Sequence, residues 1–95
     1  MIEVRTTKTF DVWLDGLRDR QARSKITARL LRVRNGNLGD VKFFDGIGEI
    51  RIDYGPGYRI YFVKHGNALI ILMCGGDKST QGRDIKLALE MAKEA

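Results

Sequence analysis

The stretch that most restricts the fold is GEIRIDYGPGYRIYF, residues 48–62, in which apolar and polar side chains alternate on both sides of a glycine-proline turn. The apolar positions are Ile50, Ile52 and Tyr54 before the turn, and Tyr58, Ile60 and Phe62 after it. Such alternation is typical of β-strands with one buried face. In the turn YGPG, residues 54–57, the proline presets its own φ and the last glycine tolerates a positive φ. The segment therefore predicts an antiparallel β-hairpin.

Further strands are expected on both sides of this hairpin. The turn KHGN, residues 64–67, leads into ALIILMC, residues 68–74, which is apolar at every position. Because a strand with two apolar faces needs cover on both, we expect it to be a central strand. It is predicted to end at GGDKST, residues 75–80. Residues 2–6 alternate as a short first strand, and residues 41–44 are interpreted as a loop or a short strand.

Helical periodicity fills the rest of the chain. Thr9 is the expected N-cap of a first helix, and a break is expected near Gly16–Asp19. The second helix is predicted to end at NGN, residues 35–37. The apolar stripes are Phe10, Trp13, Leu14 and Leu17, then Ala22, Ile26, Leu30 and Val33, and near the C-terminus Ile85, Ala88, Leu89 and Ala92. The predicted order is β-α-α-β-β-β-α, a single α+β domain over residues 1–95 with an antiparallel-rich sheet of about four strands.

Charge and composition restrict the function. The formal net charge is +5, which favours polyanionic partners such as nucleic acid or the ribosome. The sequence has no apolar stretch near the about 18 residues of a membrane span and no signal peptide, so we predict a cytoplasmic protein without a membrane partner. One histidine, His65, and one cysteine, Cys74, do not make a zinc ligand set, and we predict no metal or cofactor.

Basic side chains are concentrated in the second predicted helix. Seven lie between Arg18 and Arg34, against the single acid Asp19. Lys25, Arg29 and Arg32 share one helical face. This face is either the ordinary solvated side of an amphipathic helix or a surface that docks on RNA phosphates, as on the ribosome.

Arg51 and Arg59 lie on the polar side of the hairpin, at positions that we expect to be close together across the two strands. Like charges that oppose one another across strands are destabilising. Either Glu49 and Asp53 neutralise the arginines, or an anion binds between them. Under the second interpretation Tyr61, on the same face as Arg59, offers a ring that stacks on a base.

The segment GGDKST runs from a predicted strand toward the last helix. It can present backbone N–H groups and Lys78 to a phosphate. It lacks the upstream glycine spacing of a nucleotide-binding loop, so ATP and GTP binding are rejected.

Three segments together resemble the RelE/ParE superfamily of bacterial toxin–antitoxin modules, and most closely its HigB-type, addiction module killer branch. They are FDVWLDGLRDRQARSKITARLLRVRNGNLGD, GIGEIRIDYGPGYRIYF and ILMCGGDKSTQGRDIKLA. The resemblance covers about residues 5–92. It implies a small antiparallel sheet with a helical hairpin and a C-terminal helix.

The resemblance also implies a function. RelE-type proteins are endoribonucleases that cut mRNA in the ribosomal A site, and each is silenced by a cognate antitoxin protein, usually encoded alongside it. For this chain we expect the antitoxin to be a helix-turn-helix DNA-binding protein. By this resemblance Arg51, Arg59 and Lys78 are the catalytic residues, and the two arginines converge on the scissile phosphate. Lys42 and Tyr61 are then expected to contact mRNA or the ribosome, together with the basic helical face.

The tail DIKLALEMAKEA, residues 84–95, contains neither the tyrosine of RelE nor the histidine of some HigB proteins. Asp77 and Asp84 are expected to organise the loop before the last helix or to cap that helix. Two alternatives remain open at this point. One is a non-enzymatic ParE-like toxin that poisons DNA gyrase, and the other is an RNA-binding module without catalysis.

Overall fold

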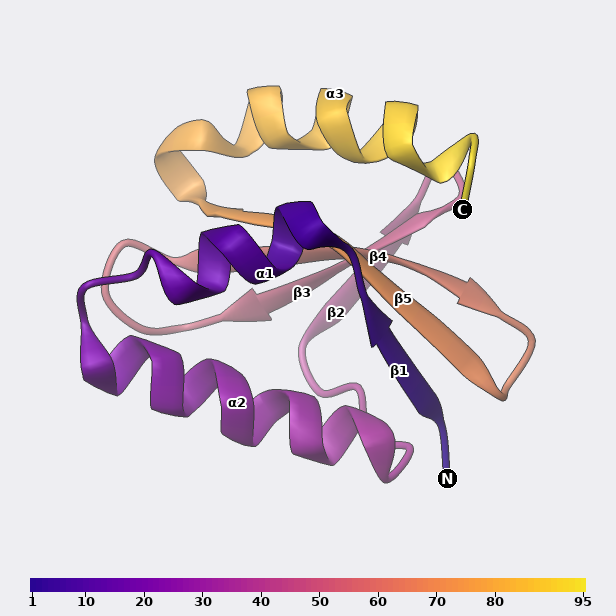
Figure 1. Cartoon of the computed structure of the whole chain (residues 1–95), viewed down its shortest axis with the longest axis horizontal. Helices are drawn as coiled ribbons and strands as arrows, with labels where there is room; N and C mark the ends of the chain where they lie inside the picture. The colour runs from indigo at the N-terminus through magenta and orange to yellow at the C-terminus, as the bar shows by residue number, and fades with distance from the viewer.

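The computed structural model describes residues 1–95, which form an α+β domain with a five-stranded mixed sheet and three helices (Figure 1). The elements in chain order are β1 (Glu3–Thr6), α1 (Lys8–Asp15), α2 (Arg20–Arg34), β2 (Val41–Phe44), β3 (Ile47–Ile52), β4 (Tyr58–His65), β5 (Leu69–Asp77), the short 3₁₀ helix η1 (Lys78–Thr80) and α3 (Gln81–Ala92). None of the helices is long and apolar enough to cross a lipid bilayer.

The predicted sheet of about four strands is wrong, because residues 41–44 form a fifth strand. The observed order of elements is β-α-α-β-β-β-β-α, and the strands lie in the order β1-β5-β4-β3-β2. β2 is joined to β3 by Asp45 and Gly46, whose φ angles are 51° and 83°. Two successive positive φ angles are those of the tight hairpin turn that Asp-Gly favours. Asp45 and Gly46 therefore form the hairpin turn between β2 and β3.

β1 also departs from an antiparallel arrangement, since it pairs in parallel with β5, Val4 lying opposite Ile70. The other neighbouring strands are antiparallel. A parallel pair needs a crossover between its strands. Here the helices and the β2–β4 meander separate the two strands in sequence, and β1 occupies the edge of the sheet.

Polar side chains cap the N-termini of α1 and α2. Thr7, not Thr9, is the N-cap of α1, because its Oγ1 accepts a hydrogen bond from the Phe10 N–H at 3.1 Å. The break predicted at Gly16–Asp19 is confirmed. The Asp19 carboxylate caps α2 by accepting from the backbone N–H groups of Gln21 and Ala22, and these bonds lower the pKa of Asp19.

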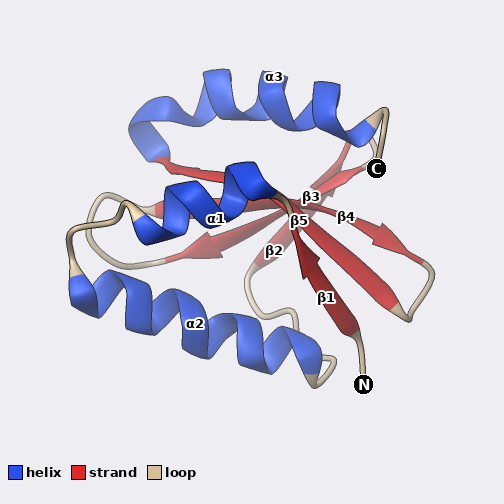
Figure 2. Ribbon diagram, viewed as in Figure 1, coloured by secondary structure: helices blue, strands red, loops and turns tan.

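The sheet separates two apolar layers, with α1 and α2 on one face and α3 on the other (Figure 2). Ile70 and Leu72 of β5 belong to the layer under α1 and α2, whereas Met73 and Cys74 belong to the layer under α3. The prediction that this strand is covered on both faces is confirmed. Glu49 and Asp84 are also buried, at 2% and 6% exposure, on the α3 side.

The strand ends within GGDKST as predicted, but three residues later than expected, since β5 continues through Gly75 and Gly76 to Asp77. A Cβ atom on Gly75 would collide with the Trp13 ring, and one on Gly76 would collide with the Asp84 carboxylate. The two glycines therefore allow α1 and α3 to approach opposite faces of the same strand. This extension of β5 determines where the next residue, Lys78, leaves the sheet.

Candidate functional site

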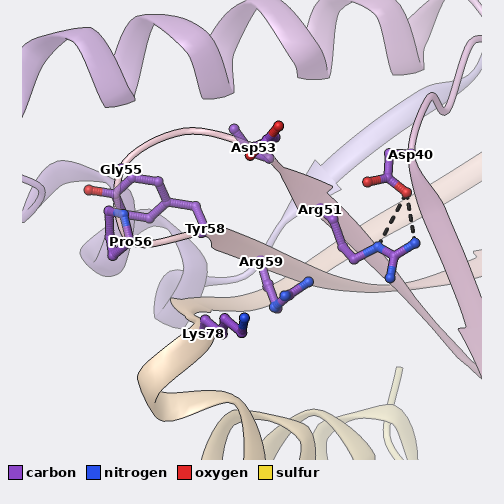
Figure 3. A pocket seen from close by; sticks show the side chains of 10 residues that line it. Asp40, Arg51, Asp53, Gly55, Pro56, Tyr58, Arg59 and Lys78 are labelled. Carbon is purple, nitrogen blue, oxygen red and sulfur yellow. Dashed lines mark hydrogen bonds and ion pairs between the residues drawn. The ribbon is translucent and has the colours of Figure 1, made fainter.

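A cleft of about 430 Å³ opens where the β3–β4 turn meets the end of β5 (Figure 3). Its wall contains all three predicted catalytic residues, Arg51, Arg59 and Lys78. Two carboxylates, Asp40 and Asp53, complete its charged lining. Cationic side chains from three separate segments of the chain are thus gathered around one opening.

Strand register accounts for this gathering. Arg51 lies directly opposite Arg59 on β4, and Arg59 lies directly opposite Gly76 on β5. Lys78 follows Gly76 by two residues and leaves the sheet at η1. The turn closes the other side, with the Gly57 N–H donating to the Tyr54 carbonyl at 3.1 Å. Gly57 has φ 81°, as the sequence predicted, and lies close to the Cβ of Lys78.

The guanidinium of Arg51 turns aside to Asp40 (Figure 3). Its Nη2 and Nε donate to Asp40 Oδ1 at 2.8 and 3.2 Å. The expected convergence of Arg51 and Arg59 is therefore not present, and the neutralising acid for Arg51 is Asp40 rather than Asp53. Both members of this pair are about half exposed, so the pair contributes only about 0–1 kcal/mol. An incoming anion can replace Asp40 at little cost.

Arg59 is the least satisfied cation of the cleft. Its side chain is 15% exposed, yet it donates no hydrogen bond within the protein, and its Nε is buried without an acceptor. The nearest acid is Glu49, with 3.8 Å between Arg59 Nη1 and Glu49 Oε1. Most buried polar groups in folded proteins have a partner. A largely buried guanidinium without one is a donor set suited to an anionic ligand.

The loop that carries Lys78 is held by two carboxylates, as expected for Asp77 and Asp84. Asp77 is the N-cap of η1 and accepts from the Ser79 backbone N–H at 2.8 Å. Hydrogen bonds from Ser79 lower the pKa of Asp77. Asp84 accepts from the Thr80 hydroxyl. Lys78 itself is exposed at the mouth of the cleft, with its backbone fixed on either side.

The predicted RNA contact of Tyr61 is wrong in this structure. Its ring is fully buried in the layer under α3, where no base can stack on it. Its hydroxyl forms no well-placed hydrogen bond, and burial raises the pKa of this phenol, helped by the nearby Glu49. The face that the sequence assigned to solvent is instead covered by α3.

The basic helical face borders a second cleft, of about 500 Å³, between α2 and the β3–β4 turn. Lys25 and Arg32 are exposed there, and Lys25 Nζ lies 5.2 Å from the centre of the Tyr54 ring. Arg29 does not point to solvent. It donates to the carbonyl oxygens of Leu38, Asp40 and Arg51, so its predicted RNA contact is corrected to a structural role.

Lys42 lies outside both clefts, on the edge strand β2. Its side chain is exposed, and its Nζ lies 5.7 Å from the centre of the Phe44 ring. It is therefore free to contact a partner but is not grouped with Arg51, Arg59 and Lys78. No residue of the tail after Asp84 lines the cleft that contains Arg51, Arg59 and Lys78.

Sequence reasoning named Glu49 only as one possible neutralising acid for the arginines and missed both its burial and its partner Gln81. Gln81 Nε2, from the first residue of α3, donates to Glu49 Oε2 at 3.0 Å. The burial of Glu49 could have been inferred from residues 68–74, which are apolar on both faces of the strand. A helix covering the second face of that strand also covers the neighbouring strands, and it therefore buries their apparently polar residues.

Comparison with known proteins gives a family but no activity. No family model matches the sequence. A Haemophilus influenzae protein, itself described as uncharacterized, is 52% identical over 94 residues, which cover 98% of this chain and 95% of that protein. At this identity over essentially the full length of both, the chain belongs to the same family as the Haemophilus influenzae protein.

Proposed function

We propose that this protein is a toxin of the RelE/ParE type, a ribosome-dependent mRNA endonuclease that is silenced by a cognate antitoxin. One observation carries the proposal. The Arg59 guanidinium is largely buried beside a cleft with Arg51 and Lys78, and it donates no hydrogen bond to the protein. A phosphodiester supplies the anionic oxygens that this donor set lacks.

The geometry suits phosphate rather than a carboxylate metabolite. The cations come from β3, β4 and η1 and line the same cleft, so more than one of them can contact the oxygens of one phosphate. The cleft is also bordered by the exposed β3–β4 turn, which leaves it accessible to a long chain passing over the surface. Guanidinium groups bind phosphate oxygens through paired, charge-assisted hydrogen bonds.

The proposed reaction is attack of an RNA 2′-hydroxyl on the adjacent phosphorus. The 2′-oxygen forms a bond to phosphorus and loses its proton, while the bond to the 5′-oxygen breaks and that oxygen gains a proton. The products are a 2′,3′-cyclic phosphate and a 5′-hydroxyl. Negative charge develops on the phosphoryl oxygens in the transition state, where fixed cations stabilise it.

In this proposal Arg59 holds a phosphoryl oxygen, and Lys78 contributes a mobile second charge. Arg51 leaves its exposed pair with Asp40 to bind RNA. The displaced Asp40 carboxylate is then free at the edge of the cleft. An arginine does not serve as the base, because a guanidinium keeps its proton in proteins. The ribosome is the proposed source of the remaining proton-transfer groups, which also places the protein in the cytoplasm.

The test is expression in bacteria with transcripts mapped by primer extension and with protein, RNA and DNA synthesis followed by pulse labelling. The proposal predicts that protein synthesis stops first and that cuts appear within codons at a fixed phase. Arg59→Ala is expected to abolish both effects. Arg5→Ala, which removes the same charge from an exposed pair with Glu3, is the matched control and is expected to remain toxic.

Other outcomes of the same experiment contradict the proposal. Intact transcripts during growth arrest count against a nuclease. DNA damage signalling before any loss of translation indicates the gyrase-poisoning alternative.

A separate co-expression experiment tests the proposed partner. Neutralisation of toxicity by a small protein encoded beside the gene would identify the antitoxin.

A further inference from the structure

A buried carboxylate lies behind the cleft and outside its lining. Glu49 is 2% exposed and sits on β3 directly opposite Tyr61. One of its oxygens accepts from Gln81 Nε2 at 3.0 Å, and the other faces Arg59 Nη1 at 3.8 Å. We infer that Glu49, itself fixed by Gln81, is a positioning residue that aims the Arg59 guanidinium at the cleft.

The contacts show how this positioning works. Gln81 is the first residue of α3, so its hydrogen bond ties the helix across β4 to β3. This bond fixes the rotation of the Glu49 carboxylate and leaves Oε1 toward Arg59. Electrostatic attraction holds the Arg59 guanidinium near Glu49, but the 3.8 Å between Arg59 Nη1 and Glu49 Oε1 is too long for a hydrogen bond. The Arg59 side chain therefore makes no hydrogen bond within the protein; its Nε is buried, and the part of the guanidinium that lines the cleft stays free for a ligand.

The cost of the arrangement supports a role beyond packing. Burying a carboxylate is expensive unless it is paired and hydrogen-bonded, and an apolar residue at this position would serve the core as well or better. Glu49 has one well-placed hydrogen bond, one long ion pair and the Tyr61 hydroxyl nearby without a well-placed bond, which is modest compensation for its burial. A side chain fixed in advance loses less freedom when it binds a ligand, so the benefit appears in RNA binding.

This inference rests on the proposed contact of Arg59 with RNA. The direction in which RNA affinity changes separates positioning of Arg59 from a general charge effect. Glu49→Gln keeps the shape of the side chain and raises the net charge by one. General electrostatics predicts tighter RNA binding for such a change. Positioning of Arg59 predicts weaker binding, by about tenfold. Glu90→Gln makes the same charge change in an exposed pair with Lys93 and is the matched control.

The probe is a fluorescently labelled 2′-O-methyl RNA oligonucleotide, which has no 2′-hydroxyl nucleophile, and binding to the full chain is followed by anisotropy. We expect Glu49→Gln to bind about tenfold more weakly and Glu90→Gln to bind at least as tightly as wild type. In the Arg59→Ala background, Glu49→Gln is expected to have no further effect. The inference is overturned if Glu49→Gln binds the RNA with wild-type affinity. It is also overturned if Glu49→Gln weakens RNA binding by the same factor in the Arg59→Ala background.

A second readout does not depend on RNA. In ¹⁵N NMR spectra, the Arg59 Nε–Hε signal of Glu49→Gln is expected to shift and to exchange faster with water, while backbone amide signals away from Glu49 stay in place. Gln81→Ala, at a partly exposed position, should produce a smaller change in the same direction. An unchanged Arg59 signal overturns the inference. Failure of wild type to cut mRNA on programmed ribosomes overturns the proposed function, and the NMR result still decides whether Glu49 positions Arg59.

Discussion

Replacing Arg29 by alanine is expected to destabilise the fold rather than to remove an RNA contact. The Arg29 guanidinium reaches from α2 to the loop before β2 and to β3, where it donates to three backbone carbonyl groups. These belong to Leu38, Asp40 and Arg51, at distances between 2.8 and 3.3 Å. Gly39 has φ 68° and packs directly against the guanidinium. Arg29 thereby fixes the backbone that carries Asp40 and Arg51 into the cleft.

The size of the effect follows from these bonds. A hydrogen bond contributes about 1 kcal/mol net, so three carbonyl groups give an upper value of about 3 kcal/mol. Asp40 and the residues just before it lie in an exposed loop, where water partly replaces the lost donor. We therefore expect Arg29→Ala to lower the free energy of unfolding by about 1.5–3 kcal/mol. Arg29→Lys should recover less than half, because one ammonium group does not span three carbonyls.

The assay is urea unfolding followed by the fluorescence of Trp13, the single tryptophan, which packs against Phe10 and Tyr58. Arg32→Ala is the matched control, since Arg32 lies one turn further along α2, is exposed and makes no ion pair or side-chain hydrogen bond. Its stability is expected to stay within about 0.5 kcal/mol of wild type. Equal stability of the two variants, with RNA affinity lost only in Arg29→Ala, would refute the structural role.

Two further predictions concern buried groups. Tyr61→Phe removes a hydroxyl without a well-placed partner, so the free energy of unfolding should be unchanged or rise by up to about 1 kcal/mol, and RNA cutting should persist. A folded Tyr61→Phe protein that no longer cuts RNA would restore the original prediction for this residue. Burial raises the pKa of the Cys74 thiol to about 11, so only about one thiol in a thousand is ionised at pH 8. Ellman's reagent should therefore label Cys74 in urea but not in the native protein, and rapid native labelling would contradict its burial.

The local sequence predicted the hairpin and the pairing of Arg51 with Arg59 across it. The grouping of Lys78 with these arginines came from the family resemblance, because it depends on the register between β4 and β5. Alternation and the glycine-proline turn determine which residues of two adjacent strands lie opposite each other. Residues 41–44 were left open as a loop or a short strand and were not counted in the sheet, because a strand of four residues is too short for a clear alternation, although Asp45-Gly46 carried the signal of a hairpin turn. The parallel pairing of β1 depends on contacts with β5, 66 residues away, and no local pattern contains it.

The remaining errors at the site share a different cause. Alternation identifies two faces of a strand but does not show what covers the second one. Once α3 lies on that face, Tyr61 and Glu49 become buried, and the polar side of the hairpin contains a carboxylate behind Arg59. Likewise, helical periodicity placed Arg29 beside Arg32 on one face. It did not show that the loop before β2 comes close enough to bind only one of them.

The most direct test of the phosphate-binding role of Arg59 is cleavage of mRNA on programmed ribosomes by the purified protein, with the new RNA ends identified. The account predicts 2′,3′-cyclic phosphate and 5′-hydroxyl ends. It also predicts a rate for Arg59→Ala at least about 100-fold below that of wild type, the loss typical of removing one donor to a transition-state oxyanion. An Arg59→Ala protein that is folded and cuts at the wild-type rate would contradict it.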